Sequence, residues 1–490
     1  MKKQVFNPYL PSWEHVPDGE PHIFGDRLYV YGSHDGGHSF CELDYVLWSA
    51  PLTDLSDWRY EGVIYRKDQD PINGAAWQGQ IPPLDPYYQS LPGPHTLFAP
   101  DAAEGPGGRY YLYYSLDFSN LISVAVADKP EGPFEFLSYV TYADGSVPKE
   151  GRKFDPAILV EKSGIYLYYG FCPEGTLPGE EEGQVFEGAM AVRLADDMHT
   201  VISKPVCVAN GCDTAKGTDY QEHPFFEAYS IRHFGDLYYF VYSSLQGHEL
   251  CYGVSKDPLG HFLYQGVLLS NADIGYKGNK NADCYWGNNH GGLVCLNGDL
   301  YIFGHRQTHG NEFNRQGIAE KVPIEENGRL GQARLTSCGL NGGPLKDRGW
   351  YPAYIACSLM GPDRDHIGHV MNGGPSAQAP DPPSDWPYIT EEGNKSYIKN
   401  MQAGSTCAFR SFSFGQDRYQ ITIEARGRGV LEVHFDQEKS PVASTLTVDS
   451  GDWAKCADEL TASSGVHALS FTVKEGQVDL AGFELDGLPE

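Results

Sequence analysis

The sequence has no long hydrophobic run. No window approaches the roughly 18 consecutive apolar residues that a membrane-spanning helix needs, so a transmembrane segment is not expected. The opening residues, MKKQVFNPYLPSW, carry two lysines with no apolar stretch behind them, which is unlike a secretory signal. We therefore expect no membrane partner.

Paired cysteines and zinc-binding motifs are also missing. The eleven cysteines are scattered, no two of them form a CxxC pair, and no HExxH motif is present. This argues against a zinc framework and against metal-dependent hydrolysis. An odd number of scattered cysteines favours free thiols in a reducing compartment over disulfides. We therefore predict a cytoplasmic protein with no organic cofactor.

Basic side chains are scarce. Lysine and arginine number 36 against 65 aspartates and glutamates, which gives a formal net charge of −29. Such a field repels nucleic acids and anionic membranes, so the expected ligand is neutral or cationic. With 490 residues, of which 41% are hydrophobic, the chain is long enough for two or three globular domains, and an oligomer is compatible with this composition.

What the sequence has in abundance is aromatic strands in a repeated unit. The clearest copy is 222–244, EHPFFEAYSIRHFGDLYYFVYSS, in which an acid is followed by a Gly-Asp turn signal and a tyrosine-rich strand. Self-similarity at a fixed spacing indicates a repeat architecture. In five units an acid or a histidine precedes a tyrosine by eleven residues, or by ten in the second unit: Asp18 and Tyr29, Asp101 and Tyr111, Asp155 and Tyr166, Glu227 and Tyr238, His290 and Tyr301.

Each unit continues with further short strands of alternating pattern, such as DYVLWSAPL (44–52) and WRYEGVIY (58–65). Five units of three or four strands predict an all-β fold, with a five-bladed β-propeller over residues 1–360. Residues 361–388 are rich in Pro, Gly and Asp, which is typical of a linker. The alternating strands of 389–490 predict a separate C-terminal β-sandwich.

Propeller geometry gives the repeated polar residues a common location. The innermost strand of each blade lines the central channel, so Asp18, Asp101, Asp155, Glu227 and His290 would face one another around the axis. Because like charges raise one another's pKa, four acids in one cavity favour a functional site over acids that cap strand ends. Hydrolysis of a sugar acetal uses one carboxylic acid to protonate the leaving oxygen and a second carboxylate to activate water or attack. Carboxyls on different blades favour the inverting arrangement, with a separation of about 6.5–9.5 Å.

Six runs of the sequence are characteristic in this respect: NPYLPSWEHVPDGEPHIFGDRLYVYGSHD, LFAPDAAEGPGGRYYLYYS, KFDPAILVEKSGIYLYYG, FFEAYSIRHFGDLYYFVYSS, NNHGGLVCLNGDLYIFGHRQT and NRQGIAEKV. With these runs the units resemble the blades of glycoside hydrolase family 43. The resemblance covers roughly residues 6–360 and keeps the family's order of motifs. It implies a five-bladed propeller that hydrolyses arabinose- or xylose-containing plant glycans with inversion.

The resemblance also implies roles for single residues. Asp18 of VPDGEP matches the general base, Asp155 of FDPA the residue that modulates the pKa of the acid, and Glu227 of FFEA the general acid. His290 of NNHG matches an axial histidine that in many members contacts a central calcium ion or its waters. Arg315 of NRQG resembles an arginine that faces the sugar.

Two motifs depart from the family's pattern. The first unit reads PDGEP instead of the commoner PDPS, and the acid of the fourth unit lies in FFEAYS instead of an EGPH context. Glu222, in EHP, is therefore an alternative acid. It lies five residues too early relative to the tyrosine strand, and the repeated offset favours Glu227.

Other residues near the motifs are candidates for sugar contacts. Asp101 could contact sugar hydroxyls, and a strand hydrogen bond to the backbone is equally compatible with its ten-residue offset. Phe98, Trp286 and Trp13 could stack on a sugar ring or pack in the core. Asp35 is expected to stabilise a turn.

The C-terminal strands resemble carbohydrate-binding module family 6, through RGRGVLEVHFD, the Trp453 region and VDLAGFELD, and a domain that packs against the propeller is the alternative. The leading prediction is an exo-acting α-L-arabinofuranosidase on arabinoxylan- or arabinan-derived oligosaccharides. One alternative is a β-xylosidase on xylo-oligosaccharides. Another is a non-catalytic glycan-binding propeller, which would have lost one of Asp18, Asp155 or Glu227.

Overall fold

The computed structural model describes residues 3–73, 95–117, 119–176, 180, 183–362 and 386–488. Over this range the protein is almost entirely β-structure. No described helix is long and apolar enough to cross a membrane. The helices found there are single turns of 3₁₀ geometry: Lys67–Gln69, Pro106–Gly108, Tyr276–Gly278, Gly339–Asn341 and Ala353–Ile355.

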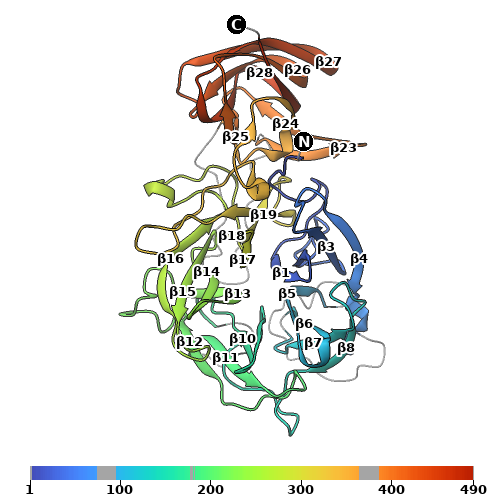
Figure 1. Cartoon of the computed structure of the whole chain (residues 1–490), viewed down its shortest axis with the longest axis vertical. Helices are drawn as coiled ribbons and strands as arrows, with labels where there is room; N and C mark the ends of the chain where they lie inside the picture. Colours follow the sequence, from blue (N-terminus) through green and yellow to red (C-terminus); the bar gives the residue numbers. More distant parts are fainter. Residues whose placement is uncertain are drawn as a thin grey trace.

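The first 19 strands form five antiparallel sheets arranged as blades (Figure 1). Four sheets have four strands and the fifth has three. The blades are β1 Glu20–Phe24, β2 Arg27–Tyr31, β3 Tyr45–Pro51 and β4 Arg59–Tyr65; β5 Leu97–Glu104, β6 Tyr110–Leu116, β7 Ser123–Ala127 and β8 Glu135–Tyr139; β9 Ala157–Glu161, β10 Gly164–Tyr169, β11 Gly188–Leu194 and β12 Val206–Asn210; β13 Phe225–Phe234, β14 Leu237–Ser244, β15 Glu249–Ser255 and β16 Leu263–Ser270; β17 Leu293–Leu296, β18 Asp299–Gln307 and β19 Arg315–Lys321.

The innermost strands close into a ring. Each of β1, β5, β9, β13 and β17 contacts the innermost strands of the two neighbouring blades, and β17 meets β1. A parallel bridge between Gly19 and Gly291 links the first and fifth blades beside that junction. The predicted five-bladed propeller is therefore confirmed.

Tight turns fix the first hairpin of each blade. The fifth blade turns at Asn297 and Gly298, which have φ of 54° and 89°. Positive φ at both central residues is the type I′ pattern, whose twist matches that of the flanking strands. The Gly-Asp pairs of the repeated unit serve the same connection in the first and fourth blades, where Gly25 and Gly235 have φ of 62° and 64°.

The tyrosines of the repeated unit join the blades to one another. Their rings lie in hydrophobic clusters between adjacent blades. Several hydroxyls donate a hydrogen bond to a backbone carbonyl of the next blade, as Tyr168 does to Pro258 at 2.7 Å and Tyr31 to Pro130 at 2.6 Å. A buried phenol needs such a partner, which explains why the strands use tyrosine as well as phenylalanine.

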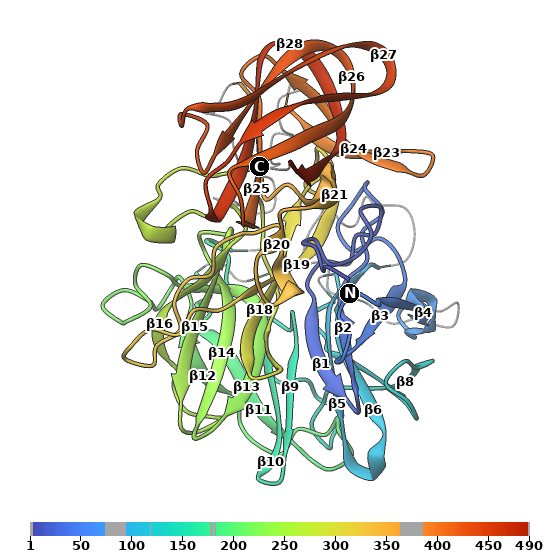
Figure 2. The same ribbon diagram turned by 45° about the horizontal axis from the view of Figure 1, so that its top comes forward.

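The C-terminal strands form one sheet of nine members around a single hydrophobic core. Its three longest strands have 18, 20 and 23 residues and curve over the top of the molecule (Figure 2), which lets one continuous sheet enclose the core. The strands are β20 Leu345–Lys346, β21 Gly349–Pro352, β22 Ser358–Met360, β23 Tyr388–Glu392, β24 Lys395–Gln402, β25 Thr406–Phe414, β26 Arg418–Phe435, β27 Val442–Thr461 and β28 Gly465–Gly487.

The boundary between the two parts lies earlier than predicted. Strands β20 to β22 precede residue 361, yet they pair with β25 and β28 of the C-terminal sheet. Strands β20 to β22 are therefore part of that sheet, and Leu359 also forms a bridge with Cys284 of the propeller. Most of the predicted linker, 363–385, lies outside the described residues.

Candidate active site

Three carboxyl groups and a histidine gather where the innermost strands begin. Asp18 precedes β1, Asp155 precedes β9, Glu227 is close to the start of β13, and His290 precedes β17. All four are buried. Asp18 and Asp155 have φ of 58° and 43°, a left-handed conformation that is uncommon outside glycine and is concentrated at functional sites.

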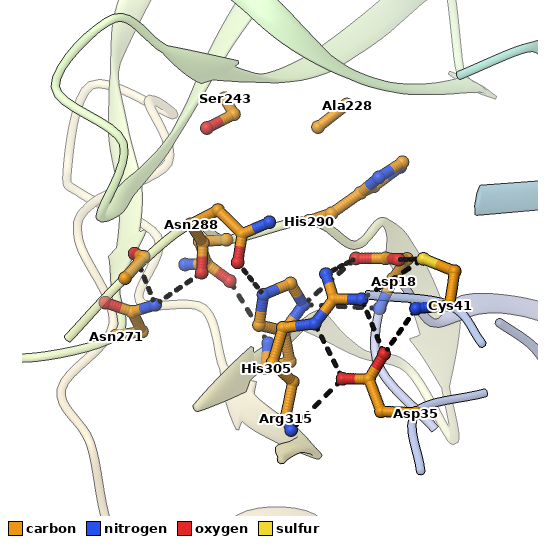
Figure 3. A network of polar contacts seen from close by, with 12 residues as sticks. Asp18, Asp35, Cys41, Ala228, Ser243, Asn271, Asn288, His290, His305 and Arg315 are labelled. Carbon is orange, nitrogen blue, oxygen red and sulfur yellow. Dashed lines mark hydrogen bonds and ion pairs between the residues drawn. The ribbon is translucent and has the colours of Figure 1, made fainter. Parts of the chain in front are cut away.

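Asp18 lies in a positively polarised setting (Figure 3). Its Oδ1 accepts a hydrogen bond from Arg315 Nη1 at 3.1 Å and lies 3.3 Å from His305 Nδ1. Burial alone would raise the pKa of Asp18, but the positive charge of Arg315 outweighs it and lowers the pKa below the ordinary value. Asp18 is therefore the ionised carboxylate of the site.

Arg315 is itself fixed by Asp35. The guanidinium donates from Nε to Asp35 Oδ2 at 2.8 Å and from Nη2 to Asp35 Oδ1 at 2.9 Å, a bidentate pair with both partners buried. The ring of Phe40 lies 4.9 Å from the guanidinium carbon. Asp35 thus has a larger role than the predicted turn, because it orients the arginine that holds Asp18.

His305, supported by Asn288, binds the backbone N–H of Asp18. The amide N–H of Asp18 donates to His305 Nδ1 at 3.2 Å, so the proton of the neutral ring is on Nε2, which faces Asn288 Oδ1 at 3.2 Å. Burial lowers the pKa of His305 to about 3, so the ring stays neutral. The repeat gave no signal for either residue, since both lie away from its fixed offset.

Asp155 and Glu227 are held side by side. Asp155 Oδ2 accepts the N–H of Ala228 at 3.0 Å, which ties it to the residue after Glu227. The pairing of β13 with β14 is irregular on both sides of Glu227, and Ala228 has φ of 68°. Such a bulge re-aims a side chain. Here the bulge lies at Glu227, whose carboxyl group joins those of Asp18 and Asp155.

The charges of the three carboxyls are coupled. Burial, and then the charge of Asp18, raise the pKa of Glu227 to about 8. Burial, followed by the charges of Glu227 and Asp18, raises the pKa of Asp155 well above its ordinary range. At neutral pH the site therefore combines an ionised carboxylate, Asp18, with a protonated carboxyl, Glu227. Glu222, the alternative acid, is exposed and bonds to Gln221.

Asp101 lies in a different environment from the other acids. Its Oδ1 accepts from Ala102 N–H at 2.7 Å and faces His22 Nε2 at 2.6 Å, while its Oδ2 accepts the N–H of Ile158 at 2.8 Å. The side chain is fully enclosed. Asp101 thus links the second and third blades and does not lie at a surface open to sugar. This agrees with the alternative prediction, a hydrogen bond between Asp101 and the backbone.

The predicted aromatic contacts divide into three cases. Phe98 is partly exposed and begins a row of rings that continues through Phe154 and Phe171 to Phe226, next to Glu227, with centroid distances of 5.1, 5.0 and 5.2 Å. Phe154 and Phe226 precede Asp155 and Glu227 in the sequence, so the row runs beside the carboxyl cluster.

Trp286 is buried in the core between the fourth and fifth blades, with its ring 5.2 Å from His248, so the structure favours its packing role. Trp13 is 59% exposed and lies 6.3 Å from the ring of Trp48. Of the two tryptophans, Trp13 alone offers a broad free surface.

His290 was the predicted contact to calcium. Its Nδ1 lies 3.6 Å from Asp155 Oδ2, and burial lowers its pKa, so the ring is neutral. Calcium takes six to eight oxygen ligands, and within the described ranges His290 belongs to no group of three potential protein ligands. The residues around it do not build a calcium cage, and an ion bound there through water stays a prediction.

Two other groups bring three potential ligands together in the described part of the chain: Glu20, His22 and Asp101, and His223, Glu249 and Cys251. In each group the ligand atoms are already hydrogen bonded to one another, at 2.6 Å between His22 and Asp101 and at 2.5 Å between His223 and Glu249. In the first group Arg232 also donates to Glu20 at 2.7 Å, which supplies the positive charge. In the second group Cys251 also donates to Glu249, whereas in the first Glu20 Oε1 is buried without a hydrogen-bond partner.

A family model described as Glycosyl hydrolases family 43 matches residues 24–330. The chain belongs to glycoside hydrolase family 43. This family 43 chain is 43% identical, over 99% of both proteins, to a protein of Thermoclostridium stercorarium named Xylosidase/arabinosidase. It is 23% identical to an Arabinoxylan arabinofuranohydrolase of Paenibacillus polymyxa, over 93% of this chain and 68% of the relative.

A solved structure supports the fold over both parts of the family 43 chain. The arabinoxylan arabinofuranohydrolase of family 43 from Bacillus subtilis, in complex with cellotetraose, is similar with a TM-score of 0.50 at 18% identity. The match covers 98% of this chain and 97% of that one. The predicted family is thus confirmed, and with it the class of glycoside hydrolases.

Proposed function

We propose that this protein is an inverting, exo-acting glycoside hydrolase that removes α-L-arabinofuranosyl residues from arabinoxylan- or arabinan-derived oligosaccharides. The observation that carries the proposal is the division of charge within one buried cluster. The pKa of Asp18 is lowered, while the pKa of Glu227 is raised to about 8. Carboxyls whose environments drive their pKa values apart are suited to act as base and acid in one reaction.

In this mechanism Asp18 is the general base. Its carboxylate is held by Arg315, and its backbone N–H by His305, while it accepts a proton from water as the water oxygen attacks the anomeric carbon. Glu227 is the general acid and gives its proton to the departing glycosidic oxygen. Asp155 modulates the acid, because it is coupled to it by charge and bonds to the N–H of Ala228.

The choice of sugar rests on the relatives. The Thermoclostridium stercorarium relative is named for both xylosidase and arabinosidase, and the Paenibacillus polymyxa relative, similar over most of this chain, is named for arabinofuranose release from arabinoxylan. These names favour arabinofuranose and support β-xylosidase as the second candidate. A non-catalytic glycan-binding propeller is disfavoured, since Asp18, Asp155 and Glu227 are all present and charge-coupled.

Hydrolysis of two aryl glycosides tests the assignment. We expect p-nitrophenol to be released faster from the α-L-arabinofuranoside than from the β-D-xylopyranoside, and NMR of the first product formed to show the inverted anomer. Turnover of the xyloside alone would replace the proposal with β-xylosidase. Retention of configuration would exclude Asp18 as a base acting through water.

We infer that the C-terminal sheet is a packing domain and not a second sugar site. Trp453, the best candidate for stacking on a sugar, already contacts Arg426 at 4.6 Å, Lys395 at 5.0 Å and Tyr397 at 5.1 Å. A ring engaged by two cations and an edge-on tyrosine offers little face to a glycan. Isothermal titration of the protein with arabinoxylan and xylo-oligosaccharides tests this, and a second binding site that Trp453→Ala removes would contradict it.

A further inference from the structure

A buried arginine joins the C-terminal sheet to the propeller, beside Ser358 Oγ and the N–H of Leu359, which donate to the backbone carbonyl of Asp283 at 2.7 and 3.1 Å. Arg410 lies in β25 where the pairing with β28 slips between Phe409 and Phe412, so its side chain leaves the sheet. The guanidinium donates from Nη1 to Asp273 Oδ2 at 2.6 Å and from Nη2 to the carboxylate of Asp283. Both acids belong to the segment between the fourth and fifth blades.

That segment, residues 271–288, leads directly into the active site. Its two ends are tied together, because Asn271 Nδ2 donates to the carbonyl of Gly287 at 3.1 Å and to that of Asn288 at 2.9 Å. Its middle is closed by the N–H of Asp283, which donates to the carbonyl of Ala272 at 2.9 Å. Hydrogen bonds thus connect the part of the segment that carries both aspartates to Asn288.

Asn288 is the residue that holds His305. Its Oδ1 faces His305 Nε2 at 3.2 Å, and His305 Nδ1 accepts the backbone N–H of Asp18 at 3.2 Å (Figure 3). The contacts thus run without a gap from Arg410 through the segment to Asn288, His305 and Asp18.

We propose that Arg410 is a positioning residue for Asp18, through which the C-terminal sheet contributes to hydrolysis without touching the sugar. The proposal rests on the proposed role of Asp18 as the base. A merely structural arginine would affect stability alone, whereas a positioning one also affects the rate at which a properly folded enzyme turns over. A small misplacement of a catalytic group, on the order of 1 Å, can cost about 100-fold in rate.

Three variants separate these roles. Arg410→Met removes the two charged contacts and leaves Asp273 buried without its cation. Asp273→Asn/Asp283→Asn/Arg410→Met removes the charged contacts and the unpaired charges together and keeps the bonds of Ser358 and Leu359 to the carbonyl of Asp283, so we expect its fold to be retained. Arg426→Met is the matched control, since Arg426 also forms two carboxylate pairs, but within the C-terminal sheet.

Steady-state kinetics on the better aryl glycoside give the first readout. In the triple variant we expect kcat to fall roughly 10- to 100-fold, with KM changed by less than about threefold. The acid limb of kcat/KM should shift toward higher pH, because a displaced Asp18 is less well held by Arg315 and its pKa is then lowered less. Arg426→Met should keep the kcat and pH profile of the unmodified enzyme. A triple variant with unchanged kcat and acid limb would overturn the proposal.

Hydrogen exchange gives a readout that does not depend on turnover. Peptides covering 271–291 and 299–307 should exchange faster in the triple variant than in the unmodified protein, and unchanged in Arg426→Met. If the unmodified protein hydrolysed no glycoside, the proposed function would fail while this exchange still tested the link from Arg410 to His305. Equal exchange in all proteins would overturn the link itself.

Discussion

Replacement of Glu227 by Gln should have an effect that depends on the leaving group. The amide introduced by Glu227→Gln cannot act as a general acid, so a substrate with a poor leaving group, such as an arabino-oligosaccharide, should lose about 10²- to 10⁴-fold in kcat. An aryl glycoside with a strongly activated phenol leaves without protonation and should lose less than about tenfold. Glu222→Gln, which changes an exposed glutamate five residues away, should keep full activity on both.

The pH dependence of the same variant tests whether Glu227 is the group that holds the catalytic proton. Because burial and Asp18 raise the pKa of Glu227 to about 8, kcat/KM of the unmodified enzyme should fall as the pH rises through about 8, where Glu227 loses its proton. This basic limb should vanish in Glu227→Gln, while the acid limb, set by Asp18, remains. Equal losses on both substrates, or a basic limb that persists, would refute Glu227 as the acid.

Two substitutions test the scaffold by urea unfolding. Asp35→Ala leaves the buried Arg315 without its bidentate partner and should lower the free energy of unfolding by about 3–5 kcal/mol. Asp35→Asn keeps a hydrogen-bond acceptor and should lower it by less. Equal losses in the two variants would contradict the role of the ion pair. Tyr168→Phe deletes the bond to Pro258 in the next blade and should cost about 1 kcal/mol, whereas Tyr166→Phe, whose hydroxyl bonds within its own blade, should cost less.

The sequence was sufficient for the propeller because its blades repeat. A strand of alternating aromatics with a turn at a fixed place sets both the pleat and the direction of every inner strand, so an equal offset puts Asp18, Asp155 and Glu227 at one end of the ring. The same offset favoured Glu227 over Glu222 as the candidate acid. Asp101, one residue out of step, bonds to the neighbouring blade instead.

Residues outside the repeat could not be predicted in this way. Asp35, Asn288 and His305 reach Asp18 or its arginine from loops and from strand β18, and their contacts depend on how separate blades pack. The boundary was misplaced for a related reason. Strands β20 to β22 are two to four residues long, too short for an alternating pattern, and only their pairing with β25 and β28 assigns them to the C-terminal sheet.

A crystal structure of Glu227→Gln with an uncleaved arabino-oligosaccharide measures the central geometry most directly. The anomeric carbon should lie between Asp18 and the substituted side chain, with a water on Asp18 and the two side-chain termini about 6.5–9.5 Å apart. A sugar bound away from Asp18, or a separation of about 5–5.5 Å with no room for that water, would contradict hydrolysis by a base and an acid on opposite sides of one acetal.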